Sequence, residues 1–284
     1  MCRTCGRRYP VVEDIPRLLD DSLPGIAAKR AEIAGWVELA KEQGWYTPDD
    51  AVDRALPYVC RDLGWDDRNW RANEHSFDVL LQRYVRPGMR VLEVGAAKSW
   101  AAQHLLPLGV EYVATDILDD SNIGLGRGAF YGEFLRVQAD GEHLPFADAA
   151  FDLAYCVATL HHALDLGRMV RELARVTRRG GTVAALNEGT RALGRSEENP
   201  EQEREKELGI NEHVHSLPGY LWAFARAGLV VRRIEQAEGR ADLERRRIAG
   251  RLLRLPGVGR SAATLFSQCC HGYSGVSIYA LKAV

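Results

Sequence analysis

Between Arg90 and about Glu188, the sequence alternates short, apolar, β-rich segments with helical patterns. This alternation is typical of βαβ units joined into a mostly parallel sheet. It predicts five strands, at residues 91–94, 112–115, 135–138, 153–157 and 182–186. The central segments are almost continuously apolar, as expected of strands that helices cover on both faces. The predicted fold class is therefore α/β.

Further patterns extend this prediction in both directions along the chain. Residues 229–234 and 276–281 have the character of a sixth and a seventh strand, whereas the charge-dense segment 197–207 is predicted as an exposed loop or a solvated helix. Apolar residues at helical spacing predict a helix leading into the fifth strand, namely Met169, Val170, Leu173 and Val176. Upstream, residues 25–85 predict a helical cap that docks on the sheet through Trp36, Trp45, Trp65 and Trp70.

Charge and composition exclude several classes of protein. The 284 residues include 37 Lys and Arg against 39 Asp and Glu, and the net charge of −2 gives no overall field that attracts nucleic acid. The longest apolar runs fall short of the roughly 18–20 residues that cross a bilayer, and acidic residues interrupt any signal peptide after Arg8. Six cysteines are too few for a disulfide scaffold. We therefore expect a cytoplasmic protein that forms no stable complex with nucleic acid.

The turn after the first strand is where a ligand is expected. Gly95 ends that strand, and the small residues Ala96 and Ala97 follow it, so that a ligand can approach the backbone. A nicotinamide-binding fingerprint requires glycines at positions 95, 97 and 100, but the last two are Ala97 and Trp100. This difference argues against a dehydrogenase.

Two more strands end in carboxylates. Asp116 closes the second strand, where an acidic side chain can accept hydrogen bonds from both hydroxyls of a ribose. Asp140 closes the third strand and can accept from an exocyclic amine of a base. Since the carboxyl ends of parallel strands meet at one edge of a sheet, these groups predict a nucleoside site.

Four successive motifs resemble those of class I S-adenosylmethionine-dependent methyltransferases over roughly residues 90–190: VLEVGAAKSW, VATDI, VQADGEHLPFADAAFDLAYCVATLHH and LARVTRRGGTV. The resemblance implies a Rossmann-like sheet of seven strands, mostly parallel with the last antiparallel, with helices on both faces and here an N-terminal helical cap. It also implies S-adenosylmethionine as the cofactor. The two C-terminal strands predicted above agree with this family fold.

By the same resemblance, Glu93 and Gly95 would border the amino-acid part of the cofactor, Asp116 would hold its ribose, and Asp140 with Gly141 its adenine. Cys156 would contribute backbone at the end of the fourth strand. The expected cofactor contacts are Glu93, Gly95, Ala96, Ala97, Asp116, Ile117, Asp140, Gly141, Cys156 and His161.

The sequence also departs from the family pattern around this turn. Ala97 and Ser99 replace glycines that are usual in the family. Lys98 between them is unusual, and we expect it either to pair with the cofactor's carboxylate or to lie in solvent. Trp100 is expected to pack in the core rather than to form a platform for the cofactor.

Four histidines are the candidate catalytic residues, although methyl transfer in an aligned, dry site does not require a dedicated base. His161 and His162 follow the fourth strand directly, at the rim where an acceptor should enter, and we favour a stacking role for them over proton transfer. His213 and His215 are separated by one residue, so an extended backbone would place both on one face of the acceptor pocket.

The N-terminus contains one CxxC sequence, formed by Cys2 and Cys5, and resembles the second knuckle of a zinc ribbon. A tetrahedral zinc site needs four ligands, so zinc is not expected from this pair alone. Three explanations stay open. The upstream knuckle is missing from this chain, the sequence is a remnant, or Cys269, Cys270 or His271 completes the site.

The predicted organisation places a zinc-ribbon-like remnant at 1–20, the helical cap at 21–86 and the methyltransferase domain at 87–284, with a substrate or lid insertion at 190–274. Seven arginines between Arg240 and Arg260 predict a basic amphipathic helix, either solvated or in contact with anionic lipid headgroups or a phosphorylated substrate. We expect a small-molecule acceptor of natural-product, glycan or lipid type. The alternatives are an RNA or protein methyltransferase and an inactive cofactor-binding regulator. The sequence leaves the oligomeric state open.

Overall fold

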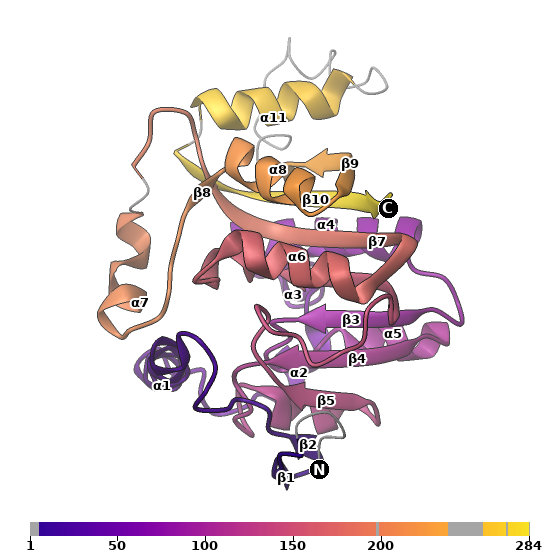
Figure 1. Cartoon of the computed structure of the whole chain (residues 1–284). Coiled ribbons are helices and arrows are strands. Elements are labelled where there is room, and N and C mark those ends of the chain that lie inside the picture. The colour runs from indigo at the N-terminus through magenta and orange to yellow at the C-terminus, as the bar shows by residue number, and fades with distance from the viewer. Residues whose placement is uncertain (1–5, 197–198, 238–257, 271, 284) are drawn as a thin grey trace.

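A computed structural model of the chain describes residues 6–196, 199–237, 258–270 and 272–283. Its main sheet follows the spatial order β5 (Leu135–Gln138), β4 (Glu111–Asp116), β3 (Arg90–Val94), β6 (Phe151–Val157), β7 (Thr177–Arg191), β10 (Tyr273–Lys282) and β9 (Leu229–Glu235). The two-residue strand β8 (His215–Ser216) pairs with the end of β7. Figure 1 shows this sheet running through the whole molecule.

The strand directions confirm the predicted fold class. Strands β3 to β7 pair in parallel, and β10 runs antiparallel to both of its neighbours, β7 and β9. The seven main strands contain the seven predicted segments, and β7 and β10 extend furthest beyond them. The order changes direction at β3 and β6, and ligands of such sheets bind outside the carboxyl ends at this position.

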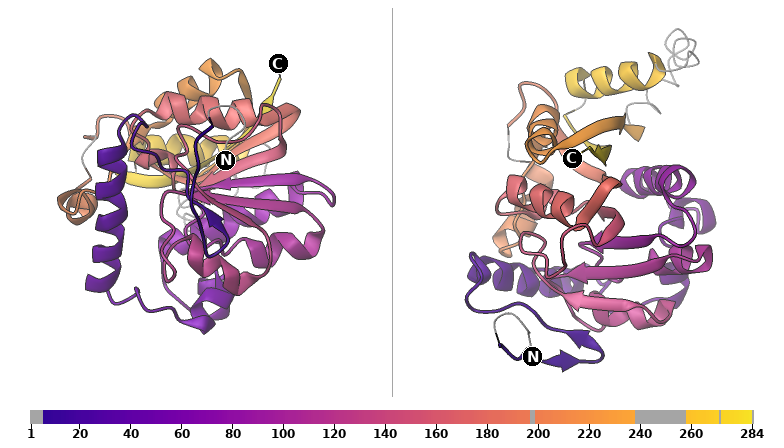
Figure 2. Two further views of the ribbon diagram at one scale, coloured as in Figure 1. Left: turned by 60° about the horizontal axis from the view of Figure 1, so that its bottom comes forward. Right: turned by 45° about the vertical axis from the view of Figure 1, so that its right-hand side comes forward.

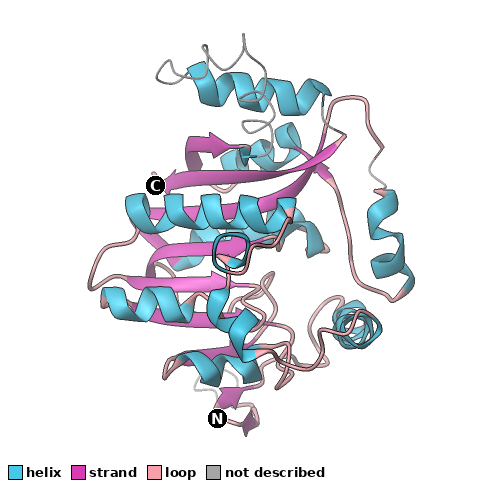
Figure 3. Ribbon diagram, turned by 180° about the vertical axis from the view of Figure 1, so that it is seen from behind, coloured by secondary structure: helices cyan, strands magenta, loops and turns pink. Residues whose placement is uncertain are grey.

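Helices cover both faces of the sheet, as the alternation of strand side chains requires. Val91 and Tyr155 contribute to one core cluster, and Leu92 and Ala154 contribute to the other. The second cluster includes the buried stripe of α6 (Leu166–Val176), which confirms the predicted helix, together with α8 (Leu217–Arg226). Figure 1 shows α6 and α8 in front of the strands, and Figure 3, the view from behind, shows helices on the other face of the sheet. Among the described residues, the other α-helices after β3 are α5 (Ala102–Leu105), α7 (Glu203–Glu207) and α11 (Val258–Cys270). The 3-10 helices there are η1 (Leu106–Leu108), η2 (Leu125–Tyr131), η3 (Leu160–His162) and η4 (Pro200–Gln202).

The N-terminal third forms the predicted helical cap, with α1 (Ile26–Glu42), α2 (Asp50–Ala55), α3 (Val59–Asp62) and α4 (Arg68–Tyr84). Helix α4 packs on the sheet, where Tyr84 stacks on Tyr279 of β10 with 5.0 Å between ring centroids. Helix α1, by contrast, does not lie on a face of the sheet. Figures 1 and 3 place it, together with α7, beyond the carboxyl ends of the parallel strands.

The hairpin of β1 (Val11–Val12) and β2 (Ile15–Pro16) leads into the free edge of β5. Arg17 bridges Gln138 in parallel, and the N–H of Leu18 donates to the Gln138 carbonyl at 2.9 Å. Figure 2 shows this N-terminal segment beside the sheet. Cys2 and Cys5 lie outside the described residues.

Two further predictions concern the C-terminal third. The charged segment after Pro200 contains the short helix α7, whose side chains are mostly exposed, as a solvated helix requires. Most of the arginine-rich segment, residues 238–257, lies outside the described residues. Among the described helices, none combines the length and the apolar character that a membrane crossing requires.

Candidate functional site

A cavity of about 400 Å³ opens at the carboxyl ends of β3 to β6. The turns after these four strands form its floor, and α1 with two nearby tryptophans forms the opposite wall. The strand-end residues of the lining include Gly95, Ala97, Asp116, Ile117, Asp140, Gly141, Thr159 and His162. The structure therefore brings together six of the ten predicted cofactor residues in one cavity.

Asp116 links the ends of β3 and β4. Its Oδ2 accepts from the N–H of Ala97 at 2.7 Å, and its Oδ1 accepts from the N–H of Leu118 at 2.8 Å. Burial raises the pKa of Asp116, and the backbone hydrogen bonds oppose this shift. Each carboxylate oxygen can accept more than one hydrogen bond. The carboxylate retains acceptor capacity on the cavity side, as recognition of a vicinal diol requires.

The turn after β3 holds several residues in left-handed conformations. Gly95 has a φ of +73°, and a Cβ there would lie 2.2 Å from Cγ2 of Thr159, so only glycine fits. Ala97 and Ser99, which replace family glycines, have φ values of +43° and +58°. Both side chains therefore occupy a conformation that costs an L-residue roughly 1–2 kcal/mol.

Asp140 is held in a buried network. Its Oδ1 accepts from the N–H of Glu142 at 3.0 Å, and its Oδ2 contacts Nδ1 of His143 at 2.9 Å. The ammonium of Lys29 lies 3.5 Å from Asp140 and 3.0 Å from Glu142. Burial by itself lowers the pKa of Lys29, but these carboxylates outweigh it and raise the pKa. Lys29 thus balances the negative charge after β5, where Asp140 is the residue predicted to bind adenine.

Glu93 does not contact the cavity, which corrects its predicted place beside the cofactor. Its side chain points to the opposite core, where the hydroxyl of Tyr112 donates to its carboxyl group and Tyr155 is its neighbour in β6. Burial raises the pKa of Glu93 to about 7. The alternation of side chains along β3 explains the error, because the residue that faces the cavity is Val94.

Ala96, Cys156 and His161 also lie outside the lining. Ala96 is buried in the core, and the cavity reaches β6 at Val157 rather than at Cys156. The thiol of Cys156 instead lies 3.5 Å from Oε1 of Glu188. The side chains of these three residues therefore lie outside the cavity.

His161 forms an ion pair with Glu188, a residue of β7 that the sequence analysis missed. Nδ1 of His161 donates to Oε2 of Glu188 at 2.9 Å, and the N–H groups of Thr159 and Leu160 donate to Oε1 at 3.0 Å each. Burial lowers the pKa of His161, but Glu188 outweighs it and raises the pKa. Burial alone would raise the pKa of Glu188, but the hydrogen bond and charge of His161, together with the backbone N–H groups, outweigh it and lower the pKa. Glu188 thereby fixes the turn that carries both histidines.

His162 is the histidine that faces the cavity. Trp36 packs edge to face against its ring, with 5.6 Å between centroids, and its Nδ1 lies 2.7 Å from the carbonyl oxygen of Asn211. Burial and the neighbouring charge of His161 hold the pKa of His162 well below its usual value. A neutral imidazole that packs against an indole agrees with the predicted stacking role, which stays a prediction.

His213 and His215 do not line the cavity, which corrects the prediction of a shared acceptor face. Their ring centroids lie 6.0 Å apart, and His213 is exposed. The backbone explains this placement, because the N–H of His213 donates to the carbonyl of His161 at 3.0 Å. The segment thus uses its backbone to hold the His161 turn, and His215 packs against Tyr220.

Five residues of the cavity wall opposite the sheet were not predicted as site residues, and one of them is Lys29, described above. Glu32 of α1 lies beside His162, with 3.4 Å between Oε1 and Nδ1, and burial together with Asp116 and Glu212 raises the pKa of Glu32 to about 8. The others are Trp36, Trp45 and Trp70. The sequence predicted for these tryptophans only a role in docking the helical cap on the sheet. Helical spacing could have placed Lys29, Glu32 and Trp36 on one face of α1.

Lys98 and Trp100 lie beside the site. Both expectations for Lys98 were wrong, since its ammonium lies 3.0 Å from the fully buried carboxylate of Asp53, which Arg127 also contacts at 2.8 Å. Trp100 packs edge to face on Phe77, with 4.9 Å between centroids, as expected of a core residue. Both side chains therefore anchor the helical cap to the turn after β3.

Comparison with known proteins identifies the domain. Residues 92–185 match the family model described as "Methyltransferase domain". The chain contains a class I S-adenosylmethionine-dependent methyltransferase domain. The match extends from β3 into β7, and the carboxyl ends of β3 to β6 carry the cavity.

The methyltransferase domain also has relatives among curated proteins. A demethylmenaquinone methyltransferase from Corynebacterium urealyticum is 31% identical over 118 residues, which cover 42% of this chain and 47% of the relative. A malonyl-[acyl-carrier protein] O-methyltransferase from Erwinia billingiae is 33% identical over 98 residues, 34% of this chain and 38% of the relative. The chain thus spans about half the length, or less, of these relatives.

Solved structures share the fold of the methyltransferase domain. Geranyl diphosphate C-methyltransferase from Streptomyces coelicolor, solved with Mg²⁺, geranyl diphosphate and S-adenosyl-L-homocysteine, has a TM-score of 0.60 at 17% identity, covering 92% of this chain and 98% of that one. A complex of the Haloferax volcanii Trm112 methyltransferase activator with a methyltransferase gives 0.53 at 21% identity, covering 84% and 100%. These identities establish the fold alone.

Proposed function

We propose that this chain transfers a methyl group from S-adenosylmethionine to a small-molecule acceptor in the cavity between α1 and the sheet. One observation carries the proposal. The glycine turn after β3 and the two carboxylates Asp116 and Asp140 meet in a single cavity, inside a domain of the methyltransferase family.

The residues of the cavity floor fit the cofactor. Asp116 can accept from the ribose hydroxyls, and the backbone at Gly95 and Ala97 suits the amino-acid part. Gly141 suits the flat adenine, because a Cβ there would lie only 2.7 Å from Cε of Met169 and would narrow the floor. When bound, the cofactor supplies an electrophilic methyl group on a sulfonium.

The wall opposite this floor suits an acceptor with an apolar or flat surface. Trp36, Trp45 and Trp70 present indole rings to the cavity, and Trp45 is partly exposed at its edge. Indoles contribute large apolar contact areas and stack with other rings. Glu32 and His162 are the titratable groups of the wall beyond the residues assigned to the cofactor and their partner Lys29.

In this arrangement the protein's own residues align the acceptor and exclude water. Well-oriented reactants reach effective molarities of ~10⁵–10⁸ M, so alignment supplies most of the acceleration. The carboxyl group of Glu32 is placed to accept a hydrogen bond from a hydroxyl acceptor beside His162, and it can take the proton of that hydroxyl only once it is itself ionised, above its pKa of about 8. A carbon nucleophile would use the same wall for packing alone.

Calorimetry tests the cofactor half of this proposal. S-adenosylhomocysteine should bind with one site per chain, and NADH should give no heat. Heat with NADH, combined with none from S-adenosylmethionine or S-adenosylhomocysteine, would overturn the cofactor assignment.

Methyl transfer tests the acceptor half. With labelled cofactor and fractionated cell extract, label should enter the low-molecular-mass, apolar fraction. Trp70→Ala should raise KM for that acceptor and leave S-adenosylhomocysteine affinity unchanged, whereas Trp65→Ala, outside the cavity, should change neither. Label in RNA with salt-sensitive retention, label in protein, or cofactor binding without transfer would each refute the small-molecule assignment.

A further inference from the structure

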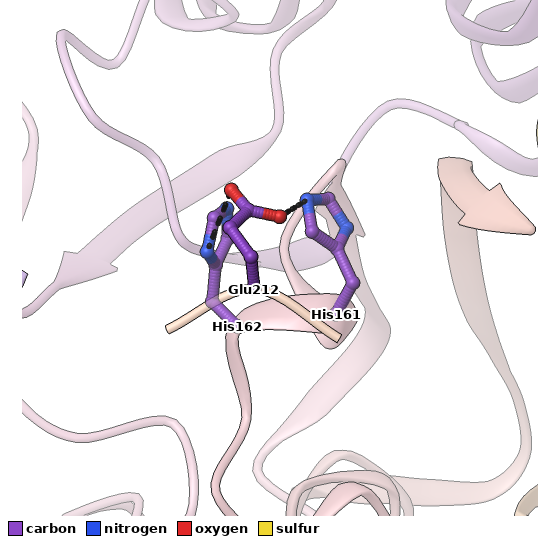
Figure 4. A group of neighbouring side chains, drawn as sticks. All are labelled: His161, His162 and Glu212. Atoms are coloured by element: carbon purple, nitrogen blue, oxygen red, sulfur yellow. Dashed lines mark ion pairs between the residues drawn. The ribbon is translucent and has the colours of Figure 1, made fainter. Parts of the chain in front are cut away.

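We propose that His161, His162 and Glu212 form a binding site for one divalent transition-metal ion beside the cavity. One ligand atom from each of these residues lies within 4.8 Å of the other two. Figure 4 shows the carboxylate of Glu212 between the two imidazole rings. This site is separate from Cys2 and Cys5 and from the strand-end carboxylates.

The spacing of the donor atoms suits chelation. Oε2 of Glu212 lies 3.7 Å from Nε2 of His161, and its Oε1 lies 3.6 Å from Nδ1 of His162. Two ligands each ~2.1 Å from one ion stand roughly 3.0–3.4 Å apart at octahedral or tetrahedral angles. The observed separations exceed these values by only a few tenths of an ångström, which small side-chain rotations can close.

The surroundings orient the ligands as in a metal site. Glu188 accepts from Nδ1 of His161 and so directs Nε2 toward Glu212, and an ion that binds there displaces the proton that Nε2 carries in the ion pair. A carboxylate behind a ligating imidazole is the usual arrangement in metalloproteins. The amide of Gln202 donates to Oε2 of Glu212, which holds the third ligand in place.

His162 must change its hydrogen bonding to take part. Its Nδ1 now lies at hydrogen-bond distance from the carbonyl of Asn211, so the ring proton sits on Nδ1. Binding an ion through Nδ1 requires the proton on Nε2, a tautomeric change of a neutral imidazole. The carboxylate of Glu32, 3.4 Å from Nδ1, is a fourth oxygen ligand within reach.

The donor set points to a class of ion. Two imidazoles and one carboxylate form the combination found in sites for zinc and for divalent iron. Mg²⁺ and Ca²⁺ prefer oxygen ligands throughout. Since two of the three ligands are buried and two supply nitrogen, we expect Zn²⁺ to bind more tightly than Mn²⁺, in the usual order of stability.

The position of the site gives the ion a role, and this step rests on the proposed function. His162 belongs to the cavity wall, so an ion bound to it has an open coordination position toward the acceptor. An acceptor with a hydroxyl, enol or carboxylate oxygen could occupy that position. The ion would then orient the acceptor and lower the pKa of its hydroxyl group.

Metal binding to the full chain tests the proposal without any methyl acceptor. After removal of bound metal with a chelator, equilibrium dialysis against ZnCl₂ should load one equivalent per chain. Glu212→Gln should weaken Zn²⁺ binding at least tenfold. Glu188→Gln, which changes only the group behind His161, should weaken it by about 10- to 100-fold.

Two control variants should retain the wild-type affinity for Zn²⁺. His213→Gln removes an exposed imidazole one residue away from Glu212, and Glu207→Gln removes an exposed carboxylate in α7. Binding of S-adenosylhomocysteine, measured separately, reports whether each variant is folded. Absence of Zn²⁺ binding by the wild type, or equal binding by a folded Glu212→Gln variant, would overturn the metal site and leave the methyltransferase proposal standing.

Discussion

The carboxylate of Asp116, at the end of β4, accepts a hydrogen bond from the backbone N–H of Ala97, with 2.7 Å between Oδ2 and the nitrogen. The bond joins the ribose-binding candidate directly to the turn that follows β3. The acceptor group and the shape of the turn are therefore coupled. A substitution at either position should affect cofactor binding.

Asp116→Ala should weaken binding of S-adenosylhomocysteine by about 10- to 100-fold. Hydrogen bonds to a charged group contribute roughly 1.5–3 kcal/mol, and the alanine leaves both the turn and the ribose without an acceptor. Isothermal titration calorimetry measures the change. Asp148→Ala, which removes an exposed carboxylate far from the cavity lining, should leave the affinity as it is. Equal affinity of the Asp116 variant would place the nucleoside elsewhere.

Ala97→Gly should stabilise the protein by about 1 kcal/mol. Ala97 has a φ of +43°, and glycine adopts this conformation without the steric cost that a Cβ imposes. Urea unfolding should show a higher midpoint with an unchanged slope. Ala96→Gly is the matched control, because residue 96 is not in the left-handed region and should lose stability instead. A destabilised Ala97 variant would contradict the strain inferred here.

Glu93 should make stability fall as pH rises from about 4.5 to about 7. The carboxyl group has a pKa of about 7 when folded and about 4.5 when exposed, so the folded state holds the proton through this interval while the unfolded state loses it. The contribution of protonated Glu93 to the free energy of unfolding is full below pH 4.5 and lost above pH 7. The total change in that free energy is on the order of 3 kcal/mol. Glu93→Gln should flatten the pH dependence of the unfolding free energy across this window.

The exposed Glu111 provides the control for this experiment. Glu111→Gln, on the neighbouring strand, should leave the pH dependence of the wild type intact. If Glu93→Gln and the wild type lose the same stability between pH 4.5 and 7, the buried carboxyl group is not the titrating group.

Lys29→Met should destabilise the protein by about 3–5 kcal/mol. The ammonium is only 5% exposed, and its removal leaves the buried carboxylates of Asp140 and Glu142 without their cation. Thermal or urea unfolding measures the loss. Lys41→Met, at the exposed end of the same helix, should cost less than 1 kcal/mol. A comparable loss at both positions would mean that the buried network contributes little.

Local patterns were sufficient to predict the strands, because each buried parallel strand is an apolar run bounded by turn residues. The antiparallel direction of the last strand, β10, also agreed with the family resemblance. Strand-end residues such as Asp116 and Gly141 could be assigned to the site because the carboxyl ends of parallel strands meet at one edge of the sheet.

The rest of the site depends on contacts that no local pattern encodes. Glu188 reaches His161 across 27 residues of chain, and Glu32 reaches His162 from helix α1, in the N-terminal third of the chain. Nothing in the sequence near these glutamates indicates burial. The prediction for Glu93 failed for a different reason. The family motif specifies its position in β3 but not the face of the strand to which its side chain points.

The pairing of Arg17 with Gln138 leaves β5 with fewer open backbone groups than an outermost strand normally presents. Unpaired strand borders of this kind recruit other chains and promote aggregation. Deleting the residues before α1 would free the backbone of Gln138 at the border of β5, a strand in which Leu135 is already 49% exposed. A shortened protein should therefore self-associate as its concentration increases, even where its catalytic cavity keeps its shape.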